Sequence, residues 1–166
     1  MSHINKPKEI IPKLQAMAKS NAVWPIGIIL QPIEKKVGRW REDTFEISGV
    51  TLNTEHQQHS NENHWHVMNL DLYRDERSDY RFNLSSSNPK LFIIVEQQSS
   101  DAKPKLVAVT ASQTAVGNYL DGEYLVLSTA LPLPIQAWME AFIGRHGELL
   151  ELGRKKRKGA GRSNEQ

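Results

Sequence analysis

The clearest pattern of apolar and polar positions lies in residues 65–95. Residues 66–72 alternate apolar with polar side chains, which predicts a half-buried strand whose core face is formed by Met68, Leu70 and Leu72. Residues 80–84 alternate in the same way and are predicted as a second strand, because Tyr80, Phe82 and Leu84 share one parity. The polar residues 74–79 lie between the two runs, so we expect a hairpin.

Residues 91–95 follow a turn-like stretch that is rich in serine and ends in Asn88-Pro89. This segment, Leu91-Phe92-Ile93-Ile94-Val95, is apolar on both parities, which is typical of a strand covered on both faces. We therefore predict that it is a central strand.

Further strands are predicted at residues 24–30, near 45–50, at 105–110 and at 123–129. Ser112 is placed to cap a short helix that ends at Asp121-Gly122, and Pro134 suits the first turn of a last helix with a wide apolar stripe. Residues 8–20 have helical spacing, whereas residues 53–63 are almost wholly polar and predict a surface loop.

These elements predict an α+β fold. We expect a mainly antiparallel sheet of about six strands, with a curl toward a barrel as an open alternative, a C-terminal helix packed on it and a short helix before the last strand. The predicted organisation is an N-terminal helical or flexible arm at residues 1–23, a single domain at 24–152 and a basic disordered tail at 153–166.

The composition favours a soluble, cytoplasmic protein. Among 166 residues there is no cysteine, which excludes disulfides, thiolate nucleophiles and cysteine-ligated metal sites. The sequence has no run near the ~20 apolar residues that a membrane span needs, and no signal peptide is apparent. The net charge of +2 divides into +5 in residues 153–166 and −3 before them, which argues against a nucleic-acid-binding domain.

Four histidines crowd into residues 56–66, and two of them are the candidate metal ligands. His64 and His66 are two positions apart on a predicted strand, so their side chains point the same way, ~6.6 Å apart. The same parity places them in line with the apolar face of residues 68–72, so they also fit the rim of a core. Because no third ligand is defined, we expect no metal and no other cofactor.

Other polar clusters have structural explanations. The acidic residues of 71–79 alternate with arginines, as a solvated hairpin does, although such carboxylates are also the groups that acid–base catalysis uses. Ser85, Ser86 and Ser87 suit a turn, and no Gly-x-Ser-x-Gly motif occurs. Gly159-Ala160-Gly161 lacks the preceding strand and following helix of a phosphate loop. No catalytic residue is therefore predicted.

Two features suggest contact with a partner. Trp24, Trp40, Trp65 and Trp138 lie in separate segments, and large aromatic residues serve either as core anchors or in interfaces. The tail could contact RNA, anionic lipid or an acidic partner by charge, or could simply aid solubility, through its consecutive basic residues Arg154, Lys155, Lys156, Arg157 and Lys158.

A family resemblance adds a functional expectation. It is carried by the order of the segments WPIGIIL, VGRWREDTFEISGV, LDLYRDERSDYRFNL with NPKLFIIV, VTASQTAVGNYLDGEY, LPLPIQAWMEAFIGRH and RKKRK. In this order they resemble a bacterial family of uncharacterised proteins encoded near formate dehydrogenase genes. The resemblance covers roughly residues 24–158 and carries no known active-site residues.

This resemblance implies a non-catalytic accessory or maturation protein for a molybdenum- or tungsten-dependent formate dehydrogenase. The expected partner is a formate dehydrogenase subunit or another maturation factor. Members are sometimes labelled molybdopterin-guanine dinucleotide biosynthesis protein A, so the alternative is an enzyme of molybdenum cofactor biosynthesis. The chain lacks the glycine-rich nucleotide loop after a first strand that such an enzyme uses.

Overall fold

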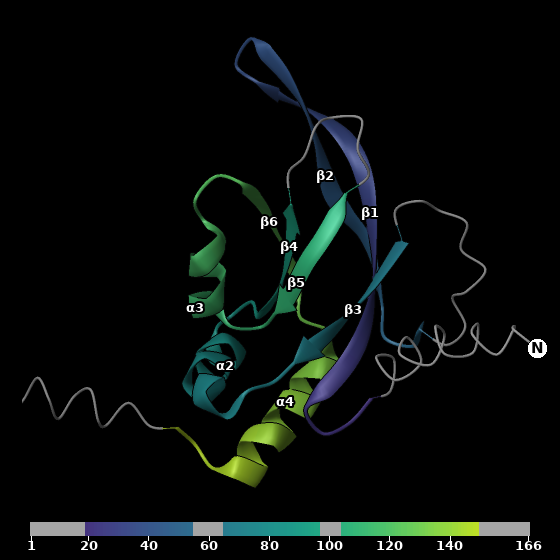
Figure 1. Cartoon of the computed structure of the whole chain (residues 1–166). Coiled ribbons are helices and arrows are strands. Elements are labelled where there is room, and N and C mark those ends of the chain that lie inside the picture. The colour runs from purple at the N-terminus through teal and green to yellow at the C-terminus, as the bar shows by residue number, and fades with distance from the viewer. Residues whose placement is uncertain (1–18, 55–64, 97–103, 150–166) are drawn as a thin grey trace, which may run out of the picture.

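The computed structural model describes residues 19–54, 65–96 and 104–149, and all statements about the structure refer to these. They form an α+β fold with two three-stranded antiparallel sheets, ordered β2-β1-β3 and β5-β4-β6. Figure 1 shows the sheets facing each other, with helices at one end and one side. The predicted fold class is confirmed, but the two sheets do not close into a barrel, because no hydrogen-bonded ladder joins them.

The first sheet is built around β1 (Val23–Val37), which pairs with β2 (Trp40–Thr51) and β3 (Trp65–Asp71). Alternate residues of β1 face the core, and those that are buried there are Trp24, Ile26, Ile28 and Leu30. β3 adds Leu70 to the same face, as its alternation predicts. The predicted strand at residues 24–30 is confirmed, but it runs past Pro32 as far as the turn at Gly38.

The second sheet has β4 (Lys90–Glu96) at its centre, between β5 (Lys105–Thr110) and β6 (Tyr124–Ala130). Leu91 and Ile93 belong to the main core cluster, while Ile94, one position on, is also fully buried. The prediction of a central strand covered on both faces is therefore confirmed.

The predicted strand at residues 80–84 is wrong, because this segment is the helix α2 (Arg77–Ser85), which follows the 3₁₀ turn η3 (Arg74–Glu76). The alternation of Tyr80, Phe82 and Leu84 suggested a strand, but Tyr80 and Leu84 are also four residues apart and share a helix face. Phe82 points away and is 69% exposed. Residues 66–72 accordingly pair with β1 instead of forming the predicted hairpin.

Asn83 explains how α2 is attached to the second sheet. Its side-chain amide donates hydrogen bonds to the carbonyl oxygens of Lys90 (2.8 Å) and Ala111 (2.9 Å), and its Oδ1 accepts one from the Lys90 N–H (2.9 Å). These bonds satisfy backbone groups at the start of β4 and the end of β5. A buried polar residue therefore joins this helix to the second sheet, in addition to the packing of Tyr80 and Leu84 against the core.

The C-terminal half follows the predictions closely. Ser112 caps α3 (Gln113–Val116) by accepting a hydrogen bond from the Ala115 N–H, and the 3₁₀ turn η4 (Gly117–Tyr119) follows. The last helix, α4 (Leu133–His146), has Pro134 in its first turn and buries its predicted stripe, Ile135, Trp138, Met139, Phe142 and Ile143.

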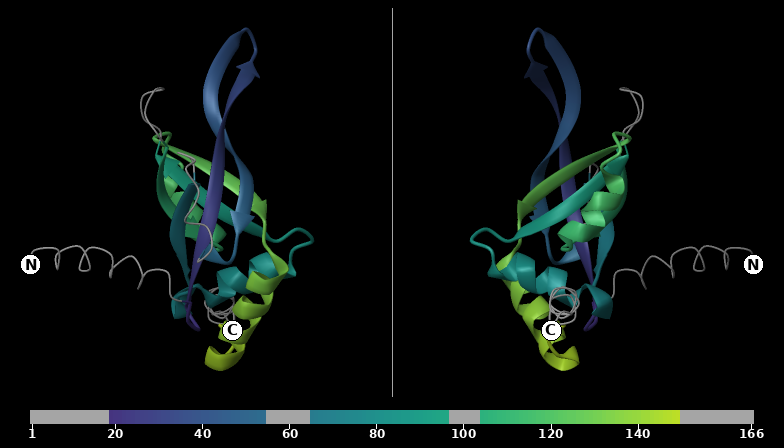
Figure 2. Two further views of the ribbon diagram at one scale, coloured as in Figure 1. Left: turned by 90° about the vertical axis from the view of Figure 1, so that its right-hand side faces the viewer. Right: turned by 90° about the vertical axis from the view of Figure 1, so that its left-hand side faces the viewer.

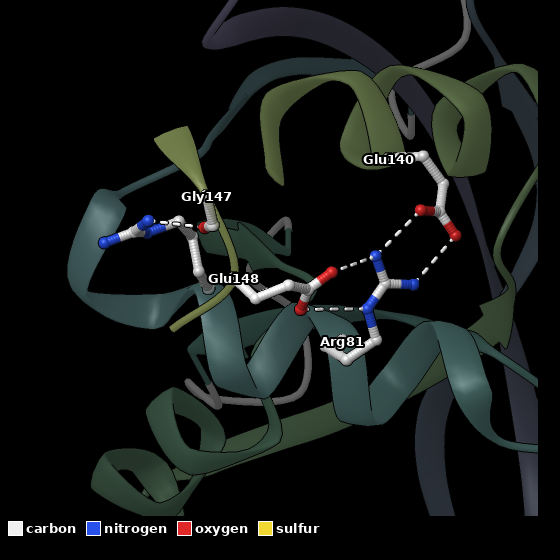
Figure 3. A network of polar contacts seen from close by, with 5 residues as sticks. Arg81, Glu140, Gly147 and Glu148 are labelled. Atoms are coloured by element: carbon white, nitrogen blue, oxygen red, sulfur yellow. Dashed lines mark hydrogen bonds and ion pairs between the residues drawn. The ribbon is translucent and has the colours of Figure 1, made fainter. Parts of the chain in front are cut away.

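Helix α4 closes one end of the core. Trp138 packs edge-on against Trp24 of β1, with ring centroids 5.3 Å apart. At the surface Arg81 of α2 makes paired hydrogen bonds to Glu140 (2.9 Å) and also contacts Glu148 (2.8 Å), as Figure 3 shows. This pairing lowers the pKa of Glu140 below its usual value and joins α2 to α4.

In the part of the chain that the structure describes, no helix has the length and apolar character needed to cross a membrane. Three predicted segments lie almost wholly outside the described residues. They are the N-terminal helical or flexible arm, the polar loop and the C-terminal tail.

Candidate interaction surface

The hairpin formed by β1 and β2 extends beyond the rest of the first sheet. β3 pairs only with the first part of β1, up to Ile29, whereas the pairing with β2 continues to Val37. Figure 2 shows this hairpin projecting past the body of the molecule. We call residues 33–44 the hairpin extension. All residues from 34 to 43 are exposed.

The hairpin extension ends in a two-residue turn whose geometry depends on glycine. Gly38 has φ of 64° at the first turn position, the position at which a type II′ turn places glycine. Val37 and Trp40 are paired across the turn, and the register continues through Lys35 with Glu42. This turn and register fix which side chains share a face.

Trp40 is the most exposed of the large apolar side chains that the structure describes. It is 76% exposed, and its cross-strand neighbour Val37 is 47% exposed. In contrast, Trp24 and Trp138 are in the core, and Trp65 is partly buried. From the sequence, each of the four tryptophans could be a core anchor or an interface residue. Of the four, the structure places only Trp40 on an open surface.

Basic residues surround Trp40. Residues 35–41 carry four cationic side chains and no acidic one, namely Lys35, Lys36, Arg39 and Arg41. Acidic residues follow directly behind this tip, where Glu34 is paired with Asp43 and Glu42 is paired with Lys35. Arg41 makes an exposed ion pair with Glu34 at 3.3 Å. The tip is thus a cationic, aromatic end on a hairpin whose flanks are acidic.

A second feature is a cleft of about 460 Å³ beside the neighbouring edges of β3 and β5. Four consecutive residues, Val107 to Thr110, line it from β5, so the open edge of that strand faces the cleft. Asp71 and Glu76 line it from the other side, and burial raises the pKa of both carboxyl groups. Among the described lining residues there is no lysine or arginine.

Glu76 is held in place by Tyr80. The buried Tyr80 hydroxyl donates a hydrogen bond to the Glu76 carboxylate (2.7 Å) and accepts one from the Tyr73 N–H (2.8 Å). Burial, together with this carboxylate, raises the pKa of Tyr80 well above its usual value. The tyrosine therefore stays neutral and serves to fasten η3 to α2. The cleft can attract a cationic or hydrogen-bond-donating group, but its charge repels an anion.

Of the two histidines named as candidate metal ligands, only His66 lies in the described part of the chain. His66 lies on β3, and by alternation it shares the core-facing side of that strand with Met68 and Leu70, as its parity predicted. His64 is outside the described residues. No group of three or more histidine, aspartate or glutamate side chains with metal-binding geometry occurs within residues 19–54, 65–96 and 104–149.

The other predicted clusters are also located. Asp79 accepts hydrogen bonds from the Ser112 and Thr114 hydroxyls at 3.1 and 2.9 Å, which joins α2 to α3. The Ser86 hydroxyl donates to the Asn83 carbonyl oxygen at the end of α2. These contacts give Asp79 and Ser86 structural roles. The predicted partner-binding residues 154–158 lie outside the described residues, so their role stays a prediction.

The sequence reasoning did not single out the hairpin extension as a candidate interaction surface. The available signal was the run Lys35-Lys36-Val37-Gly38-Arg39-Trp40-Arg41, in which an apolar pair flanks a glycine turn and four cations surround it. If both strands extend past the body of the domain, the side chains at such a tip remain exposed to solvent. The length of the strands, however, becomes apparent only from the pairing of β1 with β2.

Comparison with known proteins identifies one family. A family model described as protein of unknown function (DUF3305) matches residues 25–158. No curated protein and no solved structure matches the chain.

Proposed function

We propose that this chain, which belongs to the family of proteins of unknown function DUF3305, is a non-catalytic accessory protein that works by binding a protein partner. The partner we propose is a subunit or maturation factor of a molybdenum- or tungsten-dependent formate dehydrogenase. The choice of partner rests on the resemblance of the chain's segments, in their order, to proteins encoded near formate dehydrogenase genes. The family description itself names no activity.

The observation that carries the proposal is the exposed Trp40 at the end of the hairpin extension. In the free protein an exposed tryptophan lacks the favourable free energy that burial of its indole would give, and a partner can supply it. Tryptophan is also enriched among the residues that dominate interface energies. Trp40 is next to the turn of the hairpin extension, which projects past the body of the molecule (Figure 2). A binding role uses this feature, whereas catalysis does not require it.

The second candidate is an enzyme of molybdenum cofactor biosynthesis, and the cleft beside β3 and β5 is the observation in its favour. Its volume of about 460 Å³ falls within the range of small-molecule sites. Its charge argues against this function, because Asp71 and Glu76 would face the pyrophosphate of a pterin dinucleotide. Phosphate sites normally present lysine, arginine or a helix N-terminus. We therefore favour the accessory role.

The test is deletion of the gene in its native host, followed by three measurements. These are formate oxidation, the molybdenum or tungsten content of the purified formate dehydrogenase, and the activity of an unrelated molybdoenzyme. Transcript levels of the formate dehydrogenase genes serve as the control for expression. Complementation with the unaltered gene must restore what the deletion removes.

The outcomes separate the two candidates. Loss of formate oxidation alone, with the transcript intact, supports a dedicated accessory role. Loss of both enzyme activities places the chain in a general step of cofactor synthesis and favours the enzyme. Full retention of both activities, under conditions in which the gene is expressed, rules out the formate dehydrogenase assignment.

A further inference from the structure

We infer that the tip of the hairpin extension docks into a compact apolar pocket rimmed by carboxylates on a protein partner, with Trp40 as the anchor. This inference rests on the proposed function for the identity of the partner, but its chemistry follows from the tip alone. It adds the contact surface and the kind of surface that receives it.

The register of the hairpin places the apolar side chains on one face. Because directly paired residues of antiparallel strands share a face, Val37 and Trp40 lie together, and the pair Ile33 and Thr44 lies on the same face one step behind Lys35. The opposite face of the extension carries the charged pairs Lys36 with Arg41 and Glu34 with Asp43. The indole and the valine at the tip therefore lie on one side of the hairpin only. An apolar group on one side can insert into a single pocket.

The charges around Trp40 select an acidic rim. Lys35 lies on the Trp40 face with Glu42 opposite it, Lys36 and Arg41 lie on the other face, and Arg39 lies in the turn. Four cations and one carboxylate are thus close to the indole, and the local charge is positive. A desolvated apolar centre with a polar rim is the usual arrangement of a binding hot spot. Carboxylates at the edge of the receiving pocket would pair with these cations and speed the encounter.

The acidic flanks argue for a compact protein surface over a nucleic acid. Glu42, Asp43, Glu34 and Glu46 follow the tip toward the body, and all four are exposed. An extended polyanion lying along the hairpin would be attracted by residues 35–41 and repelled by these carboxylates. A pocket on a protein avoids this repulsion, because only the tip enters it.

The hairpin is also suited to bind at a small entropic cost. Its two strands stay paired from Gln31 with Glu46 as far as the Gly38 turn, and the same strands continue into the buried part of the first sheet. Trp40 is thus presented on a paired ribbon and not on an open loop. Less conformational freedom is then lost on binding than for a disordered segment.

The test uses photo-crosslinking in the native host with the full-length chain. A photoreactive phenylalanine analogue replaces Trp40 in one strain and Phe82 in a second strain. Phe82 is a matched control, because it is an aromatic residue that is 69% exposed but lies on α2, away from the hairpin. Mass spectrometry then identifies the crosslinked molecule and the site on it.

We expect the probe at position 40, and not at 82, to crosslink to a protein at an apolar site with aspartate or glutamate residues around it. With that protein purified, Trp40→Ala should weaken binding about 30-fold, the loss that defines a hot spot, while Phe82→Ala changes the Kd less than about 3-fold. Lys36→Glu with Arg39→Glu should weaken binding about tenfold at low salt and less at high salt. Circular dichroism verifies that each variant is folded.

The results distinguish this inference from the proposed function. A crosslink from position 40 to an acidic site on a protein unrelated to formate dehydrogenase would support the inference and reject the proposed partner. Contact with a formate dehydrogenase subunit through position 82, with none through position 40, would do the reverse. Crosslinks from position 40 to nucleic acid or lipid, to a basic protein site, or to nothing above background would overturn the inference.

Discussion

Replacement of Asn83 by alanine should destabilise the chain by about 3 kcal/mol. The side chain is 7% exposed and makes three hydrogen bonds of 2.8 to 2.9 Å, to the Lys90 carbonyl, the Lys90 N–H and the Ala111 carbonyl. Each such bond contributes about 1 kcal/mol net, and a buried backbone group left without a partner costs about as much or more. Small domains have only about 5–15 kcal/mol of stability, so the loss is readily measured.

The assay is urea unfolding followed by far-ultraviolet circular dichroism, with comparison of the midpoint and the slope. We expect the midpoint to fall while the slope stays the same, because the unfolded surface is unchanged. Asn88→Ala is the control, since Asn88 is exposed, and its free energy of unfolding should change by less than about 0.5 kcal/mol. Asn83→Asp should be at least as harmful as Asn83→Ala, because a carboxylate would face two carbonyl oxygens. A loss below about 1 kcal/mol for Asn83→Ala would refute this account of how α2 is held.

Three further predictions concern the sheet, the cleft and the tail. Gly27→Ala should cost about 1–3 kcal/mol, because its Cβ would lie 2.4 Å from the Thr51 Oγ1, and adding Thr51→Ala should recover part of the loss; an unchanged urea midpoint would contradict the clash. Burial raises the pKa of Glu76, so the ionised carboxylate lowers the stability of the fold above that pKa. Glu76→Gln should therefore raise the melting temperature more at about pH 8 than at about pH 4. An equal effect at both pH values would speak against burial as the cause. Deletion of residues 153–166, whose only apolar side chain is Ala160, should shift the melting temperature by less than about 2 °C, and a large fall would indicate that the tail docks on the domain.

The strands with strong apolar patterns could be predicted from the sequence. In β4 the unbroken apolar run marks a strand buried on both faces, and in α4 the wide stripe that includes Trp138 and Phe142 marks a helix. Such patterns suffice because burial requires them wherever the element lies. Ser112 and Pro134 helped for a similar reason, since capping and the first helical turn are local.

Residues 77–85 could not be assigned in this way. Tyr80, Phe82 and Leu84 satisfy the period of a strand, and the helix is favoured by contacts with distant residues. Asn83 reaches Lys90 and Ala111, and Asp79 reaches Ser112 on α3. Because these partners are set by tertiary packing, the local sequence contains little evidence of them.

The candidate interaction surface was missed for a related reason. The residue type alone does not show whether a tryptophan is exposed or buried. Trp24 lies in the part of its strand that the core covers, whereas Trp40 lies in a part that extends past the core. β1 is buried through Leu30 and then leaves the core, so its last residues and the first of β2 have no sheet behind them. The pairing of β1 with β2 and β3 decides this, and it involves residues up to 48 positions apart.

The central claim is that Trp40 at the hairpin tip binds a protein partner, and an affinity measurement on the purified formate dehydrogenase catalytic subunit without its cofactor tests it most directly. Isothermal titration or biolayer interferometry would compare the unaltered chain with Trp40→Ala and Phe82→Ala at two salt concentrations. The account predicts binding by the unaltered chain, about 30-fold weaker binding by Trp40→Ala and almost no change for Phe82→Ala. Equal affinity of the unaltered chain and the Trp40→Ala variant, with both folded, would contradict it.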